Sequence, residues 1–123
     1  MYIERSISAK IIEASQQYPV LLLTGPRQVG KTTLLRKLAE DDATVHRTFI
    51  TLDDLSVRAL AISDPALFFQ RYRGPLLIDE IQYAPELLGY IKILVDRERT
   101  ATDTGSSRIN GRFWLTGSQV FTL

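Results

Sequence analysis

The sequence contains no cysteine and only a single histidine. The lack of cysteine excludes disulfide bonds and thiolate metal sites, and it is compatible with a reducing cytosol. No apolar run approaches the ~20 residues that a membrane-spanning helix needs. The first residues, Met1 to Arg5, do not have the pattern of a signal peptide. These absences predict a cytoplasmic location and no membrane partner.

An excess of charge of one sign is also lacking, because 15 basic and 14 acidic residues leave a formal net charge of +1. This balance gives no support for nucleic acid as a partner. The chain has 123 residues, of which 45% are hydrophobic and 24% charged. Such a length and composition are typical of one globular domain with one core, so we expect a single domain over residues 1–123.

The run from Gly25 to Thr32 is the most informative motif, since it fits G-x-x-x-x-G-K-[ST], the loop that wraps nucleotide phosphates. Glycines let the backbone turn so that its N–H groups face an anion. Lys31 is expected beside the β- and γ-phosphates, and the Thr32 hydroxyl is expected to ligate Mg²⁺. The predicted phosphate-binding residues are Gly25, Pro26, Arg27, Gln28, Val29, Gly30, Lys31, Thr32 and Thr33.

Apolar periodicity predicts helices that alternate with strands. Helices are expected over 3–18, 30–40, 54–63 and 64–72 and from 85 onward, and strands over 20–23, 47–52, 76–78 and 112–116. The polar stretch 100–111 is predicted to be a mobile surface loop. This alternation favours an α/β fold with a parallel sheet and right-handed crossovers.

Asp79 and Glu80 follow the apolar run Leu76 to Ile78, at the end of a predicted buried strand. Parallel sheets place their chemistry at the carboxyl ends of strands. Buried carboxylates need a cationic neighbour, and Mg²⁺ bound to a nucleotide supplies one. We therefore expect Asp79 to hold the metal and Glu80 to act as the general base on the attacking water.

Thr116-Gly117-Ser118 lies at the carboxyl end of another predicted strand. A polar side chain there can reach between the two carboxylates and the γ-phosphate, where it positions the attacking water and senses the γ-phosphate. Ser118 is favoured narrowly over Thr116 for this catalytic role.

The nucleotide class follows from motifs that are missing. No Asn-Lys-x-Asp element for reading guanine occurs, so ATP is favoured over GTP. The pair Asp79-Glu80 favours hydrolysis over transfer to another substrate. An alternative is a nucleotide-binding switch with negligible turnover. A third alternative is a nucleic-acid-dependent motor, but the sequence contains no basic stripe that would support it.

The motifs together resemble the predicted ATPases of the AAA superfamily from bacteria and archaea that carry a Gly-Pro-Arg-Gln-x-Gly-Lys-Thr loop. The resemblance is carried by Gly25 to Leu35, Leu52-Asp53-Asp54, Asp64-Pro65, Leu77 to Gln82 and Leu115 to Gln119. It implies a P-loop NTPase fold, a three-layer αβα sandwich with strand order 2-3-4-1 and a fifth strand beside strand 1. It implies the same roles for Lys31, Thr32, Asp79, Glu80 and Ser118 or Thr116.

The resemblance also implies a fifth strand, a helical lid and a C-terminal domain that have no counterpart before Leu123. The chain is therefore expected to be the N-terminal part of a longer protein. Without a fifth strand, Val20 to Leu23 would form an exposed apolar edge that can pair with another copy. We accordingly expect the 123-residue chain alone to self-associate and to be a poor ATPase.

Overall fold

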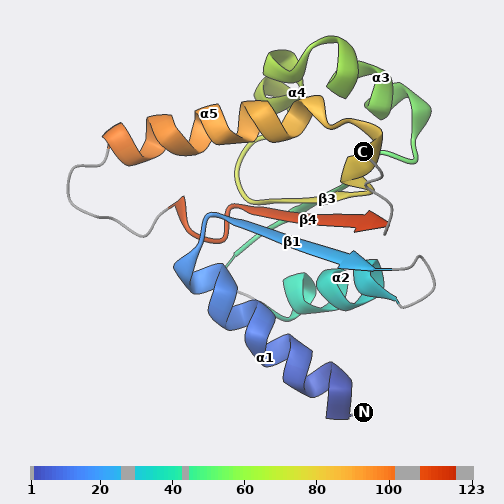
Figure 1. The fold of residues 1–123 in the computed structure, drawn as a ribbon, viewed down its shortest axis with the longest axis vertical. Coiled ribbons are helices and arrows are strands. Elements are labelled where there is room, and N and C mark those ends of the chain that lie inside the picture. The colour runs from blue at the N-terminus through green and yellow to red at the C-terminus, as the bar shows by residue number, and fades with distance from the viewer. Residues whose placement is uncertain (1, 26–29, 43–44, 102–108, 119–123) are drawn as a thin grey trace.

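The computed structural model describes residues 2–25, 30–42, 45–101 and 109–118. Helices and strands alternate along the chain, as the apolar periodicity predicts (Figure 1). In chain order the elements are α1 (Tyr2–Gln17), β1 (Val20–Gly25), α2 (Lys31–Asp41), β2 (Thr48–Thr51), α3 (Leu55–Ser63), α4 (Pro65–Arg71), β3 (Leu76–Asp79), the 3₁₀ turn η2 (Ile81–Tyr83), α5 (Glu86–Ala101) and β4 (Phe113–Ser118).

The four described strands form one sheet in the order β1-β4-β3-β2, and every neighbouring pair is parallel. This confirms the predicted α/β fold and the order 2-3-4-1. The phosphate-loop strand β1 lies at one edge of the described sheet, and its Leu22 is 45% exposed.

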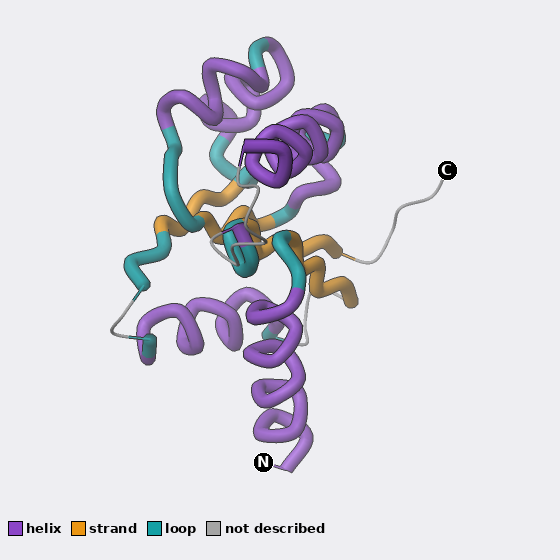
Figure 2. Tube along the Cα trace, turned by 90° about the vertical axis from the view of Figure 1, so that its left-hand side faces the viewer, coloured by secondary structure: helices purple, strands orange, loops and turns teal. Residues whose placement is uncertain are grey.

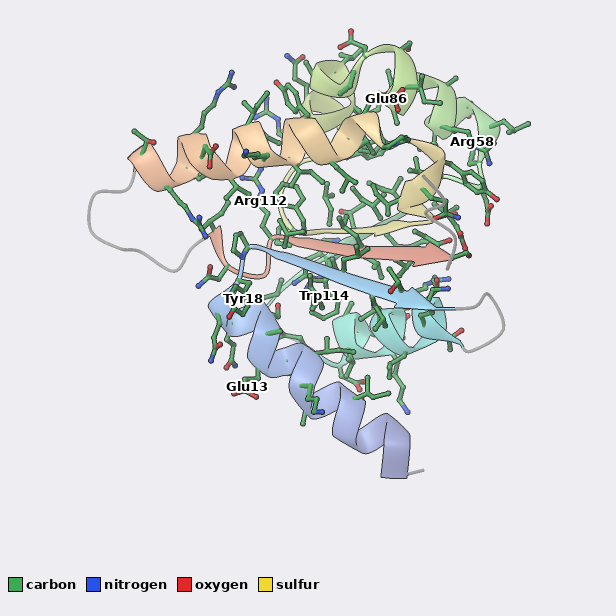
Figure 3. All side chains as sticks on the ribbon, viewed as in Figure 1. Glu13, Tyr18, Arg58, Glu86, Arg112 and Trp114 are labelled. Atoms are coloured by element: carbon green, nitrogen blue, oxygen red, sulfur yellow. The ribbon has the colours of Figure 1, made fainter. Side chains whose placement is uncertain are left out.

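Helices cover both faces of the sheet, which makes three layers. α3, α4 and α5 lie on one face, while α1 and α2 lie on the other (Figures 1 and 2). Ile78 and Phe113 belong to the core on the α3–α5 side, whereas Leu77 and Trp114 belong to the core on the α1–α2 side. Successive strand residues thus point to opposite, equally buried faces, as expected of a parallel sheet. Figure 3 shows Trp114 on the side of α1 and α2.

Aspartates begin two of the helices on the α3–α5 face. Asp64 caps α4 in front of Pro65 at the first helical position, as predicted. Asp54 caps α3 in the same way. Hydrogen bonds from the Ser56 hydroxyl and from the backbone N–H groups of Val57 and Ser56 lower the pKa of Asp54.

Two predicted strands end too early, and one turn was not predicted. β1 extends to Gly25 and β4 to Ser118, each two residues beyond the prediction, because the two backbones stay paired up to these residues. The turn missing from the prediction is η2. The stretch 100–111 is only partly a loop: α5 reaches Ala101, residues 102–108 lie outside the described residues, and Ile109 and Gly111 are buried.

Among the described residues, no helix combines the length and the apolar character needed to cross a membrane.

Gly111 precedes β4 and packs closely against the end of α1. Its N–H donates to the carbonyl of Tyr18 at 2.8 Å, and its carbonyl accepts from Arg47 Nη1 at 2.6 Å. The residue has φ 77°, and a Cβ there would lie 2.6 Å from Ser15 Oγ and 2.8 Å from the Ser15 carbonyl oxygen. Only glycine combines that backbone conformation with so close an approach.

We expect Gly111→Ala to lower the free energy of unfolding by about 2–4 kcal/mol, from left-handed strain and overpacking together. Gly89→Ala is the matched control, because Gly89 lies within α5 and a Cβ there meets no atom within 4 Å. It should raise that free energy by about 0.5–1 kcal/mol. Urea denaturation of both variants tests this, and equal effects of the two substitutions would contradict the role given to Gly111.

Candidate functional site

Polar side chains from three strands gather at the carboxyl end of the sheet, on the face that α2 covers. Strand alternation places them there. Asp79 is two residues beyond Leu77, Thr116 is two beyond Trp114, and both Leu77 and Trp114 face α2. Thr51 is paired in register with Asp79. The sequence pattern of each strand therefore delivers one polar group to the same point.

The Asp79 carboxylate accepts hydrogen bonds from three hydroxyl groups. Thr32 Oγ1 donates to Oδ1 at 2.5 Å, and Thr116 Oγ1 donates to the same oxygen at 2.7 Å. Thr51 Oγ1 donates to Oδ2 at 2.8 Å. Asp79 is only 6% exposed, so these donors replace the water that burial removes. The predicted phosphate-loop threonine and the predicted metal-binding aspartate are thus in direct contact.

The described part of the phosphate loop fits an anion at the start of α2. Gly25 ends β1, and Gly30 precedes α2 in a left-handed conformation, with φ 72° and ψ 27°. In contrast to α3 and α4, α2 has no side-chain cap among the described residues. Its first turn also contains no acidic residue. Its first backbone N–H groups therefore suit a negatively charged ligand.

Of the other predicted phosphate-binding residues, Lys31 is 5% exposed in the first turn of α2, and Thr33 is exposed on the same helix. Pro26, Arg27, Gln28 and Val29 lie outside the described residues.

Glu80 is buried, at 5% exposure, and has a left-handed backbone with φ 63°. Its Oε1 accepts from Ser118 Oγ at 2.8 Å and from Gln82 Nε2 at 2.6 Å. Its backbone N–H donates to Thr116 Oγ1 at 3.1 Å. In these contacts, the two strand-end carboxylates accept hydrogen bonds from different donors.

Ser118 and Thr116 were weighed against each other for one role, and the structure places both in the site. Thr116 donates to the Asp79 carboxylate and accepts from the backbone N–H of Glu80, whereas Ser118 donates to the Glu80 carboxylate. No role was predicted from the sequence for Thr51 or Gln82. The position of Thr51 at the carboxyl end of a predicted strand is the signal that could have identified it. The spacing of two residues between Glu80 and Gln82 predicts no contact unless the turn between them is known.

The residues present fit a magnesium ion. Asp53, Asp79 and Glu80 each offer a carboxylate oxygen, and these oxygens lie within 4.8 Å of one another. The Thr32 hydroxyl adds a neutral oxygen next to Asp79. Mg²⁺ prefers such hard oxygen ligands and usually keeps several waters. Asp53 had not been predicted as part of this group.

A family model described as an AAA domain matches residues 17–123. The chain belongs to the AAA domain family. Membership agrees with the phosphate-loop fold described above, and it supports nucleotide binding by this chain. Nucleotides in such domains are commonly bound together with Mg²⁺.

Two curated relatives of this AAA domain are 40% identical to it over 98 residues. They are the uncharacterized proteins Mb2031c of Mycobacterium bovis and Rv2008c of Mycobacterium tuberculosis. The match covers 79% of the present chain and 21% of each relative. The chain therefore spans about a fifth of the length of the curated relatives it matches.

We expect Lys31→Ala to weaken ATP binding by about 1.5–3 kcal/mol, because a charged hydrogen bond to phosphate is lost. Lys37→Ala is the matched control, since Lys37 is an exposed residue of the same helix, and it should leave the affinity unchanged. Titration calorimetry measures both. An unchanged affinity of the Lys31 variant would contradict the assignment of the phosphate loop.

Proposed function

We propose that this AAA domain binds ATP and hydrolyses it to ADP and phosphate in the presence of Mg²⁺. One observation carries the proposal. Thr32 Oγ1 of the phosphate loop donates to Asp79 Oδ1 at 2.5 Å. Glu80, the residue after Asp79, presents a second buried carboxylate at the same end of the sheet. Hydrolysis needs one group that holds the metal and a second group that accepts a proton from the attacking water, and Asp79 and Glu80 are assigned these two roles.

Binding is assigned to the first turn of α2 and to the loop before it. The N–H groups of that turn, at the positive end of the helix dipole, and the buried Lys31 favour the β- and γ-phosphates. When bound, Mg²⁺ would be held by Thr32 and Asp79 and would neutralise charge on the phosphate oxygens.

Glu80 is assigned the role of general base. It takes a proton from a water molecule while the water oxygen attacks the γ-phosphorus. The bond from that phosphorus to the bridging oxygen breaks, and the oxygen leaves with the electron pair as part of ADP. The polar group at the end of β4, Ser118, is assigned to hold Glu80 through the 2.8 Å hydrogen bond to its Oε1.

We further propose that hydrolysis drives a conformational change in another domain or partner. The chain matches only 21% of each curated relative, so those proteins contain other segments on which an ATPase domain can act. Within the AAA family, the run Gly25 to Thr32 favours the subgroup with a Gly-Pro-Arg-Gln-x-Gly-Lys-Thr loop.

Glu80→Gln should separate binding from chemistry. The amide keeps the shape of the side chain but cannot accept the proton, so ATP should bind at least as tightly while phosphate release falls roughly 10²-fold or more. Glu86→Gln, an exposed position in the first turn of α5 (Figure 3), is the matched control and should keep normal turnover.

The measurement is phosphate release by the full-length gene product, beside calorimetric ATP binding. Normal turnover of the Glu80 variant would show that Glu80 is not the base. ATP binding by the unaltered protein without any phosphate release would favour the alternative, a nucleotide-binding switch.

Asp79→Asn should raise the Mg²⁺ concentration needed for half-maximal phosphate release by about 10- to 100-fold, because the neutral amide binds Mg²⁺ more weakly than the carboxylate that would hold it. Asp96→Asn, on the exposed side of α5, is the control and should leave that concentration unchanged. Titration of Mg²⁺ at saturating ATP gives the answer. An identical requirement in both variants would contradict the role of Asp79.

A further inference from the structure

The side-chain amide of Gln82 bridges the two groups that the proposed chemistry uses. Its Nε2 donates to Glu80 Oε1 at 2.6 Å, and its Oε1 accepts from the backbone N–H of Ser118 at 3.3 Å. The Ser118 hydroxyl donates to the same Glu80 oxygen at 2.8 Å. Glu80, Gln82 and Ser118 therefore form a closed ring of three hydrogen bonds, in which both ends of the amide are engaged.

The turn η2 explains how Gln82 reaches back to a residue only two positions before it. The left-handed backbone of Glu80 reverses the chain, and the N–H of Tyr83 then donates to the Glu80 carbonyl at 3.1 Å. Ile81 and Ala84 are both 0% exposed, so they anchor the turn in the core on either side of Gln82. The amide is thus fixed in place rather than free to rotate at the surface.

The turn is also held from α3. The guanidinium of Arg58 lies 3.9 Å from the centre of the Tyr83 ring, and its Nε donates to the Leu52 carbonyl at 2.8 Å. Figure 3 shows Arg58 on α3, beside the carboxyl end of the sheet. A turn fixed on both sides gives Gln82 a constant position relative to Glu80.

We propose that Gln82 is a positioning residue for Glu80, an inference that rests on the proposed hydrolysis. A free glutamate side chain populates several rotamers, and only some of them aim the carboxylate at the attacking water. Gln82 and Ser118 together hold one oxygen of Glu80. Because Gln82 also bonds the backbone of Ser118, the base and the end of β4 keep one fixed relative position.

A second interpretation gives Gln82 only the task of stabilising the turn. The two interpretations differ in what a substitution changes. If Gln82 only stabilises the turn, its substitution lowers the free energy of unfolding. Any change in kcat is then the same whether residue 80 is glutamate or glutamine. A positioning residue affects kcat, and it does so only while Glu80 is there to be positioned.

The experiment is phosphate release by the full-length gene product carrying Gln82→Met, which keeps the length of the side chain and removes both hydrogen bonds. We expect kcat to fall about tenfold with KM for ATP unchanged. Gln17→Met, an exposed position at the end of α1, is the control and should keep normal kcat. Gln82→Glu, which keeps the acceptor for Ser118 but sets a like charge against Glu80, should lower kcat at least as far.

The same substitution is then made together with Glu80→Gln. If Gln82 acts through Glu80, Gln82→Met should cause no further loss of residual turnover in that background. An equal loss in both backgrounds, or unchanged kcat in the single variants, would overturn the inference while leaving hydrolysis established. Absence of phosphate release by the unaltered protein would instead overturn the proposed function, and the inference with it. Thermal unfolding and calorimetric ATP binding verify that each variant is folded.

Discussion

The site depends on one buried carboxylate, that of Asp79, and on the hydroxyl groups that surround it. At 6% exposure this group has lost most of its water, and an unpaired charge there would be strongly destabilising. Its partners Thr32, Thr51 and Thr116 come from α2, β2 and β4. The network is therefore complete only when those three elements are packed against β3, so the same contacts support the fold and prepare the site for a metal.

The backbone conformation of Glu80 gives its carboxylate different surroundings from those of the neighbouring Asp79. In a regular strand, Glu80 would face the helices α3–α5, opposite to Asp79. The left-handed turn with φ 63° instead aims it along the sheet end, where Ser118 and Gln82 hold it. Non-glycine residues in this region of φ and ψ are strained, and such strain is found mainly at functional sites. In the hydrogen bonds described here for the two side chains, the carboxylates of Asp79 and Glu80 accept from different donors.

Much of the fold could be predicted because its signals are local. Apolar runs mark the strands, Asp64-Pro65 marks a helix start, and Gly25 to Thr32 can be recognised without any tertiary knowledge. The end of β4 could not be predicted, because its last residues belong to the strand only through pairing with β1. Gln82 was missed because its meaning depends on a turn that no propensity of Ile81 to Tyr83 indicates.

The order of residues along the chain was enough to specify the phosphate-loop motif, the parallel α/β architecture and the two carboxylates after an apolar strand, since each is written in neighbouring residues. Packing in three dimensions was needed to show that Thr51 and Thr116 share Asp79 with Thr32, and that Ser118 serves Glu80. The physical reason is that strand order and register bring to Asp79 three residues that lie 28, 37 and 47 positions away along the chain. Hydrogen bonds form between groups that are close in space, and the order of residues along the chain does not specify which distant residues become close.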